Sequence, residues 1–171
     1  LPFFMKLMHG LSKFKIICPS PIKNNKGSYL FKIKNKSACI VTFLKGGDKK
    51  KLNPLDCRQI GEKVADLHKA TKKLKINRQN SLSIKFLPKI LNKIDKRINK
   101  FSKNLKTDMK LDLKELSKNW PKNLPSGVIH SDLFIDNIFF HKNKFYGFID
   151  FYFSSTDFYA YELATCINAL C

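Results

Sequence analysis

The sequence lacks the patterns that would assign it to several common protein classes. Its five cysteines are widely spread and form no C-x-x-C pair, which argues against a disulfide framework or a zinc site and favours the reducing cytoplasm. Lysine interrupts every apolar run before it reaches membrane-spanning length. The start of the chain does not have the form of a signal peptide. We therefore expect a cytoplasmic protein with no membrane partner.

Arginine is scarce as well. It occurs only at Arg58, Arg78 and Arg97, so the net charge of +20 comes mostly from lysines scattered over the chain. Such a charge by itself suggests an anionic partner such as nucleic acid. Sites that bind phosphates or base edges, however, usually rely on the forked arginine side chain, whereas dispersed lysine forms a solvated surface. We interpret the lysine content as a compositional bias and expect no nucleic acid partner; a basic nucleic-acid-binding module stays the alternative from another functional class.

The chain does have enough apolar residues to fold. Of its 171 residues 43% are hydrophobic and 12% are aromatic, mostly phenylalanine, so it can bury one sizeable core. Apolar residues at helical or alternating spacing, together with caps and turns, predict the secondary structure. The predicted elements are helices over 1–14, 53–74, 86–105 and 113–120, hairpins over 29–44 and 137–151, and a last helix capped by Asp157. The glycine pair in Lys45–Asp48 predicts a flexible joint, which we take as a boundary between two lobes.

Four polar residues with a fixed spacing carry the chemical signal. His130, Asp132 and Asn137 form the pattern H-x-D-x-x-x-x-N, and Asp150 follows the second predicted hairpin between apolar residues. Phosphoryl transfer needs a group that orients or deprotonates the attacking hydroxyl, and Mg²⁺ that neutralises the phosphates. Magnesium prefers oxygen ligands and takes few protein carboxylates. Asn137 and Asp150 are therefore candidate metal ligands, which leaves Asp132 free to accept the hydroxyl proton.

Each of these residues also has a purely structural interpretation. Asp132 and Asp136 are good turn residues, Asn137 can start a strand, and Asp150 can end one. For any one residue alone that interpretation is the better one, but for the whole spaced set we favour the site. His130 stands at the end of an apolar strand, where a histidine is more often buried and bonded to the backbone than catalytic, so we expect a structural role for it.

The segments His130–Phe140 and Gly147–Phe153 resemble homoserine kinases of the aminoglycoside phosphotransferase-like family. Other segments that stand in the order expected of that family lie along most of the chain. They are Leu1–Phe4, Cys18–Pro21, Val41–Gly46, Gly61–His68 and Asp157–Ala169. The sequence departs from the family at Ile135, where proline is common, and at Glu162, where aspartate is usual.

The resemblance implies an α+β, two-lobed, protein-kinase-like fold. Residues 1–45 would be the C-terminal part of the small lobe, with a helix, a hairpin and the hinge, and residues 46–171 would be a partial large lobe with the catalytic loop and the metal-binding hairpin. The resemblance makes Asp132 the catalytic base and Asn137 and Asp150 the ligands of Mg²⁺. The residues implied beside the adenine of ATP are Val41, Thr42, Phe43 and Leu44. The implied reaction is ATP-dependent phosphorylation of the side-chain hydroxyl of L-homoserine, a step of threonine biosynthesis.

Two features that such a kinase needs are missing from the sequence. A glycine-rich hairpin over the phosphates and a strand lysine would precede the opening helix, and Gly46-Gly47 lacks the frame of a phosphate loop. We therefore expect a fragment, incomplete at both ends, that turns over negligibly by itself. Choline, a thio-sugar or an aminoglycoside remain alternative acceptors, and a catalytically inactive remnant with a scaffolding role is a further alternative. The sequence leaves the oligomeric state open.

Overall fold

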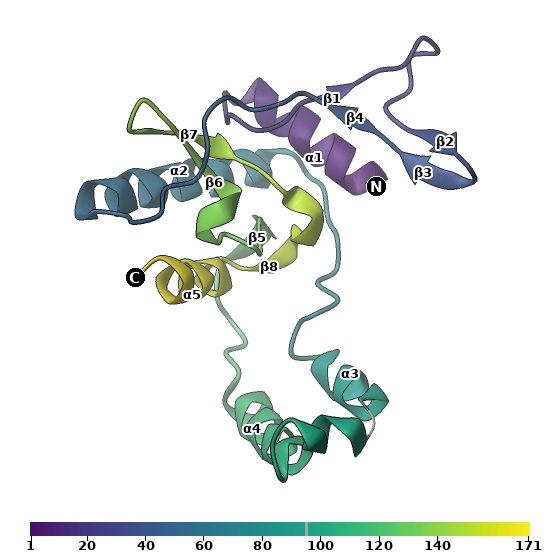
Figure 1. Ribbon diagram of the computed structural model, residues 1–171, viewed down its shortest axis with the longest axis vertical. Helices are drawn as coiled ribbons and strands as arrows, with labels where there is room; N and C mark the ends of the chain where they lie inside the picture. Colours follow the sequence, from purple (N-terminus) through teal and green to yellow (C-terminus); the bar gives the residue numbers. More distant parts are fainter. Residues whose placement is uncertain (95) are drawn as a thin grey trace. The chain divides into compact units, whose positions relative to one another are not determined.

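The computed structural model describes residues 1–94 and 96–171 (Figure 1). The chain divides into two compact units, residues 1–79 together with 125–171, and residues 80–124. The elements of the first unit are α1 (Pro2–Lys13), β1 (Pro21–Ile22), β2 (Phe31–Ile33), β3 (Lys36–Ala38), β4 (Ile40–Val41), α2 (Pro54–Lys73), β5 (Ser126–Ile129), η2 (Ile135–Asn137), β6 (Ile138–His141), β7 (Lys144–Phe148), η3 (Phe151–Phe153), β8 (Ser155–Phe158) and α5 (Tyr159–Leu170). The elements of the second unit are α3 (Leu87–Lys93), η1 (Lys96–Lys100) and α4 (Leu105–Asn119).

The opening helix α1 agrees with the prediction over residues 1–14. Pro2 stands in its first turn, where a missing amide hydrogen costs no helical hydrogen bond. Apolar residues at helical spacing then form a face that is buried in the first unit. The members of this face are Phe4, Met5, Leu7, Met8 and Leu11. The helix packs against α2, the longest helix described.

Helix α2 begins where the sequence predicts it. The Asn53 side chain accepts a hydrogen bond from the Asp56 amide at 2.9 Å, and the Asp56 carboxylate accepts one from the Asn53 amide at 3.1 Å, which together form a capping box. Lys49 Nζ lies 2.7 Å from the same carboxylate. Burial raises the pKa of Asp56, but the hydrogen bonds from Lys49 and Asn53 and the charge of Lys49 outweigh burial and hold this pKa below its usual value.

The described strands form four antiparallel pairs of two strands each. Strands β2 and β3 form a hairpin whose turn residues, Lys34 and Asn35, have left-handed φ values of 46° and 62°, as a two-residue turn requires. This part of the prediction over 29–44 is confirmed. The rest is different, because Ile40 and Val41 pair with β1 instead of extending the hairpin.

The second predicted hairpin is also confirmed. Strands β6 and β7 pair with Ile138 opposite Phe148, and both side chains are buried. Strand β5 pairs with β8, which returns from further along the chain (Figure 1). The loop between β5 and β6 contains the H-x-D-x-x-x-x-N pattern, so the two strand pairs position it from both ends.

The glycine pair before α2 is anchored to β6. Gly47 and Phe140 exchange two backbone hydrogen bonds, with N···O distances of 3.1 and 2.8 Å. Gly46 has a φ of 94°, and the Phe140 carbonyl oxygen occupies the space that a Cβ would need, so glycine is required there. These bonds hold the segment that the sequence suggested as a flexible joint, and the lobe boundary itself stays a prediction.

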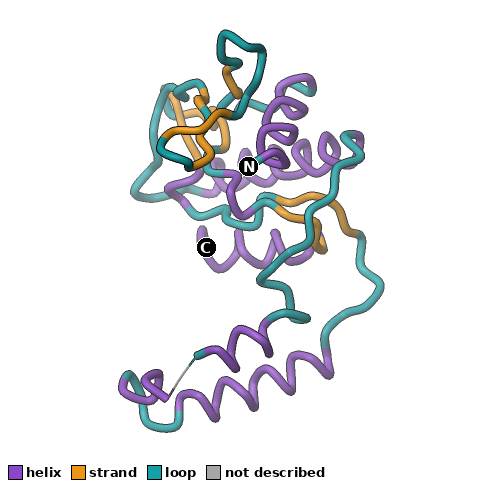
Figure 2. Tube along the Cα trace, turned by 90° about the vertical axis from the view of Figure 1, so that its right-hand side faces the viewer, coloured by secondary structure: helices purple, strands orange, loops and turns teal. Residues whose placement is uncertain are grey.

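The second unit corrects the predicted helix over 86–105. Helix α3 ends earlier, because Ile94 is extended with ψ 114°, and Lys106 Nζ caps this end by donating to the Ile94 carbonyl at 2.6 Å. Residue 95, within the predicted helix, lies outside the described residues. Beyond it the chain continues as the 3-10 helix η1 and then as α4 (Figure 2). Asn104, the residue before α4, has a left-handed φ of 65°. Helix α4 is longer than the predicted helix over 113–120.

The predicted cap of the last helix is wrong. Asp157 belongs to β8, where its carboxylate accepts a hydrogen bond from the Phe158 amide at 2.8 Å. Helix α5 begins at Tyr159 without a side-chain cap. The Tyr159 amide donates instead to the Pro125 carbonyl at 3.0 Å, so backbone pairing at the end of the β5–β8 ladder decides where this helix starts.

One buried cluster joins α1, α2 and the strands β5 to β7 in the first unit. Its members include Leu7, Leu11, Ile60, Val64, Leu67, Val128, Leu133, Ile138 and Phe148. Leu133, in the loop between β5 and β6, belongs to this cluster and is fully buried, so packing in the core helps to fix the position of the loop. Across residues 1–94 and 96–171, no helix is both long and apolar enough to cross a membrane.

Candidate active site

Asp132 and Asn137 are held together by the loop that leads into β6. The Asn137 side-chain nitrogen Nδ2 donates to the Asp132 backbone carbonyl at 2.8 Å and to the Asp132 carboxylate oxygen Oδ2 at 3.1 Å. Asn137 is buried and ends the short 3-10 helix η2, while Asp132 is half-buried. The carboxylate is therefore oriented by its neighbour and still reaches the surface.

Asp150 lies in the same region, two residues after the end of β7, the second strand of the β6–β7 hairpin. The Ile149 amide donates to the Asn137 carbonyl at 3.0 Å, so the residue before Asp150 is paired with Asn137. Asp150 is exposed and left-handed, with φ 56° and ψ 66°, and its carboxylate accepts a bond from the Tyr152 amide at 3.4 Å. A non-glycine residue in this conformation costs about 1 kcal/mol or more, and such residues gather at functional sites.

The donor chemistry of these residues fits a divalent ion that prefers oxygen. The Asn137 nitrogen donates to Asp132, which leaves its amide oxygen as a possible ligand, and Asp150 offers a carboxylate. Within the described residues, no group of three or more His, Cys, Asp or Glu side chains could hold a metal by itself. Mg²⁺ usually completes its six positions with phosphate oxygens and water, so one amide and one carboxylate match its needs, whereas zinc would lack ligands.

His130 has the structural environment expected of it. The side chain is fully buried, its Nε2 lies 2.7 Å from the Ile149 carbonyl, and its ring packs against Phe151 with centroids 4.6 Å apart. Burial lowers the pKa of His130 below its usual value, so the neutral ring donates through Nε2. The weaker, opposing influences are the charge of Glu162, the Ile149 carbonyl, and the charges of Asp132 and Asp150. The prediction of a buried histidine bonded to backbone is confirmed.

Glu162 is the main residue of this region that the sequence did not assign to the site. Its side chain is 0% exposed. One carboxylate oxygen accepts a hydrogen bond from the Ser131 amide at 2.8 Å, and the other lies 2.7 Å from His68 Nε2. Ser131 immediately precedes Asp132 and has a left-handed φ of 71°. The carboxylate of α5 therefore holds the loop in a conformation that it would not adopt readily by itself.

His68 links this carboxylate to α2. Its ring stacks on Tyr159, with centroids 4.3 Å apart and an interplanar angle of 24°. The pairing of His68 with Glu162 joins residues that are 94 positions apart, so no local pattern in the sequence announces it. The sequence pointed to Glu162 only indirectly, because the family that the chain resembles usually has aspartate at this position.

The predicted hinge residues lie in different environments. Thr42 is bound to Ser20 by two hydrogen bonds of 2.9 Å, while Phe43 is 92% exposed and Leu44 is buried. Val41 lines a small cavity of about 70 Å³ together with Asp150. The structure thus brings the start of the predicted hinge and one predicted metal ligand to the same cavity. Phe43 and Leu44 are not among the described residues that line this cavity.

The sequence matches a known family over its full length. A family model described as the phosphotransferase enzyme family matches residues 1–171. The homoserine kinase of Parvibaculum lavamentivorans is 39% identical over 171 residues, which is 100% of this chain and 53% of that protein. The homoserine kinase of Bartonella henselae is 39% identical over 171 residues, again 100% of this chain and 54% of that protein. The chain therefore spans about half the length of the curated relatives it matches.

Solved structures show which fold the chain has. An aminoglycoside-3'-phosphotransferase of type VIII matches with a TM-score of 0.70 and 13% identity, covering 98% of this chain and 63% of that one. An amicoumacin kinase, solved with AMP-PNP and Ca²⁺, matches with a TM-score of 0.66 and 15% identity, covering 96% and 51%. At these identities the likeness shows the fold alone. The predicted aminoglycoside phosphotransferase-like fold is confirmed.

Proposed function

Because the chain belongs to the phosphotransferase enzyme family, we propose that the protein transfers the γ-phosphate of ATP to the side-chain hydroxyl of L-homoserine. The acceptor comes from the curated relatives, which are 39% identical and named homoserine kinase. These relatives are about twice as long as the present chain. The activity is accordingly proposed for the whole protein, and we expect negligible turnover from these 171 residues alone.

The observation that carries the proposal is the hydrogen bonding around Asn137. Its side chain binds Asp132, and its backbone carbonyl binds the residue before Asp150. One buried asparagine thus ties the proposed base to the hairpin that bears the proposed metal ligand. Both carboxylates also act through their charges on His130, so they lie in the same region of the first unit.

In the proposed mechanism Asp132 accepts the proton of the acceptor hydroxyl. The hydroxyl oxygen forms a bond to the γ-phosphorus, and the bond from that phosphorus to the β,γ-bridging oxygen breaks, so ADP leaves with the electron pair. Asn137 holds the Asp132 carboxylate in place through its 3.1 Å hydrogen bond, which keeps the base pointed toward the reacting group.

Asn137 and Asp150 would hold Mg²⁺ in this scheme. When bound, the ion would neutralise the negative charge on the phosphates of ATP. Holding the ion with one formal charge leaves the Asp132 carboxylate uncommitted and able to act as a base. The resemblance to the family implies that adenine binds beside Val41–Leu44, and we keep this assignment as a proposal. We likewise keep residues 1–45 as part of the small lobe and residues 46–171 as part of the large lobe. The cavity shared by Val41 and Asp150 supports the adenine assignment.

The test is a pair of variants in the protein extended to the full length of its relatives. Asp132→Ala should reduce kcat for homoserine phosphorylation by about 10²- to 10⁴-fold, as expected for loss of a positioned base, with little change in the KM for ATP. Asp136→Ala is the matched control, since Asp136 is an exposed carboxylate of the same loop, and it should stay within a few-fold of the wild type. Homoserine phosphorylation at an unchanged rate in Asp132→Ala would exclude Asp132 as the base.

The acceptor needs its own experiment. The full-length protein should release ADP on addition of L-homoserine, measured beside choline, a thio-sugar and an aminoglycoside under the same conditions. If one of these three drives ADP release and homoserine does not, the family assignment stands and the acceptor proposed here is wrong.

A further inference from the structure

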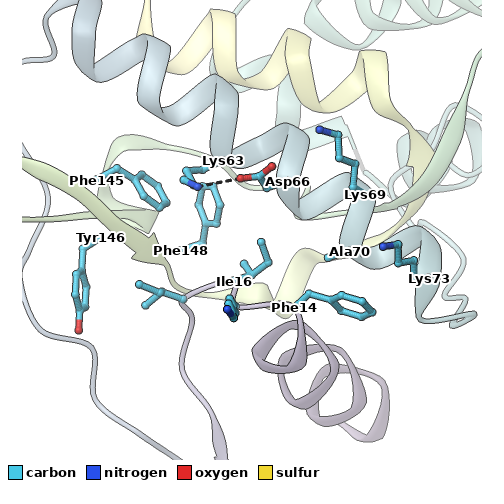
Figure 3. A pocket seen from close by; sticks show the side chains of 12 residues that line it. Phe14, Ile16, Lys63, Asp66, Lys69, Ala70, Lys73, Phe145, Tyr146 and Phe148 are labelled. Atoms are coloured by element: carbon cyan, nitrogen blue, oxygen red, sulfur yellow. Dashed lines mark hydrogen bonds and ion pairs between the residues drawn. The ribbon is translucent and has the colours of Figure 1, made fainter.

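A second cavity in the first unit lies away from the proposed catalytic residues. It has a volume of about 430 Å³, is open to solvent on one side, and is lined by the segment after α1, one face of α2 and strand β7 (Figure 3). This volume falls in the range of about 300–1,000 Å³ that is usual for small-molecule sites. None of Asp132, Asn137 and Asp150 contributes to its wall.

One wall of this cavity is cationic. Helix α2 places Lys63, Asp66, Lys69 and Lys73 along it at helical spacing, and Lys15 joins them from the turn after α1. Lys63 and Asp66 form an ion pair of 2.9 Å, so the only carboxylate among the lining residues is already matched. The remaining lysines have no anionic partner among the lining residues, which leaves this wall with a positive potential.

The other walls are apolar, and hydrogen bonds of the β7 backbone hold them in place. Phe14, Ile16, Phe145 and Phe148 line them, and Figure 3 shows the two phenylalanines of β7 facing the lysine-bearing helix across the cavity. The Phe148 amide donates to the Ile17 carbonyl at 3.1 Å, which fastens β7 to the segment after α1. The Phe145 amide donates to the Gln59 side chain at 2.9 Å, which fastens it to α2.

One of the lysines, Lys73, lies close to this apolar surface. Lys73 Nζ lies 5.5 Å from the centre of the Phe14 ring, a cation–π distance that holds the ammonium group at the rim of the cavity. Lys63, Lys69 and Lys73 are all exposed, so water can reach their charged ends. A ligand could therefore place an apolar body against the phenylalanines and an anionic group among the lysines.

We propose that this cavity binds a small amphipathic anion, with an aromatic or branched apolar body and a single carboxylate or phosphate group. Apolar burial would supply most of the affinity, and the lysines would select the charge. The proposal does not depend on the kinase activity, because the cavity shares no residue with the proposed catalytic set.

The test uses the 171-residue chain and a matched pair of probes, 1-naphthoate and the neutral 1-naphthamide, followed by NMR titration. Naphthoate should bind saturably with a Kd in the millimolar range or tighter, shifting signals of Phe14 and Tyr146, and naphthamide should bind at least about five-fold more weakly. Absence of saturable naphthoate binding, or equal binding of the two probes, would overturn the proposal.

A second comparison separates the cavity from the general lysine excess. The double variant Lys69→Gln/Lys73→Gln should weaken naphthoate binding by about five-fold or more, since it removes two cavity charges. Lys69→Gln/Lys72→Gln has the same net charge, but Lys72 does not line the cavity, so it should weaken binding clearly less. If the two doubles lose the same affinity, the attraction is a property of the whole +20 chain, and the site is refuted.

Discussion

Removal of the Glu162 carboxylate should destabilise the protein more than almost any other exchange of a charged residue. In Glu162→Ala the Ser131 amide and His68 lose the acceptor that now lies 2.8 and 2.7 Å from them. The Glu162 side chain is fully buried, so water cannot readily take the place of its carboxylate. The left-handed conformation of Ser131 would lose its external support at the same time.

The size of the effect follows from these two bonds. A hydrogen bond to a charged group contributes about 1.5–3 kcal/mol, so two of them give about 3–6 kcal/mol. The buried charge itself carries a desolvation cost that the variant no longer has, which brings the expected loss to about 3–4 kcal/mol. A domain is typically stable by only about 5–15 kcal/mol, so the variant should sit near the limit of folding.

Urea unfolding of the 171-residue chain, followed by circular dichroism, measures this loss as a fall in the midpoint at similar m-value. Glu162→Gln keeps the shape and one carbonyl oxygen, so it should lose only about 1–2 kcal/mol. Glu62→Ala removes an exposed partner of Arg58 on α2 and should lose less than about 1 kcal/mol. If Glu162→Ala also loses less than about 1 kcal/mol, the carboxylate does not hold the loop, and the reasoning fails.

Three further predictions follow from single groups. Burial lowers the pKa of His130 in the folded state, so as the pH falls below about 6.5 the unfolded state binds a proton on this ring before the folded state does. The free energy of unfolding should therefore be unaffected by His130 above about pH 6.5 and fall below it by at most about 1.4 kcal/mol per pH unit. An NMR titration in which His130 of the folded state protonates near pH 6.5 would contradict this. Asn53→Ala removes one half of the capping box and should lower the free energy of unfolding by about 1 kcal/mol, and an unchanged urea midpoint would disprove the role of the cap. Burial raises the pKa of Cys18 to about 12, so at pH 8 iodoacetamide should alkylate it far more slowly than the exposed Cys171, as read by mass spectrometry; equal rates would show that Cys18 is accessible.

The sequence predicts those parts of the fold that depend on neighbours along the chain. Asn53 followed by proline sets the start of α2 through bonds that span only three residues. The turn at Lys34-Asn35 and the hairpin that ends near Asp150 follow in the same way from short-range spacing. The same applies to Asp132 and Asn137, which stand five positions apart and do meet in space. Their catalytic and metal-binding roles stay predictions.

Errors arise where a distant contact decides the outcome. The apolar spacing over 86–105 suits one long helix, but Lys106 caps α3 at Ile94 and Asn104 starts a new helix. Asp157 is a good cap residue by type, yet pairing with β5 draws it into a strand. In both cases the local preference is worth about 1 kcal/mol, and tertiary contacts exceed it.

The position of Glu162 shows why the loop at Asp132 depends on parts of the chain that hold no proposed catalytic residue. Ser131 at the start of the loop is left-handed, and Asp150, two residues after the end of β7, is left-handed as well, so two strained residues border the region. Short-range hydrogen bonds inside the loop, such as those of Asn137, do not reach the Ser131 amide. That amide is held by a carboxylate 31 positions later on α5, which His68 of α2 fixes in turn. Changes in α2 or α5 should therefore alter the proposed base through its backbone, even when they touch neither Asp132 nor any substrate.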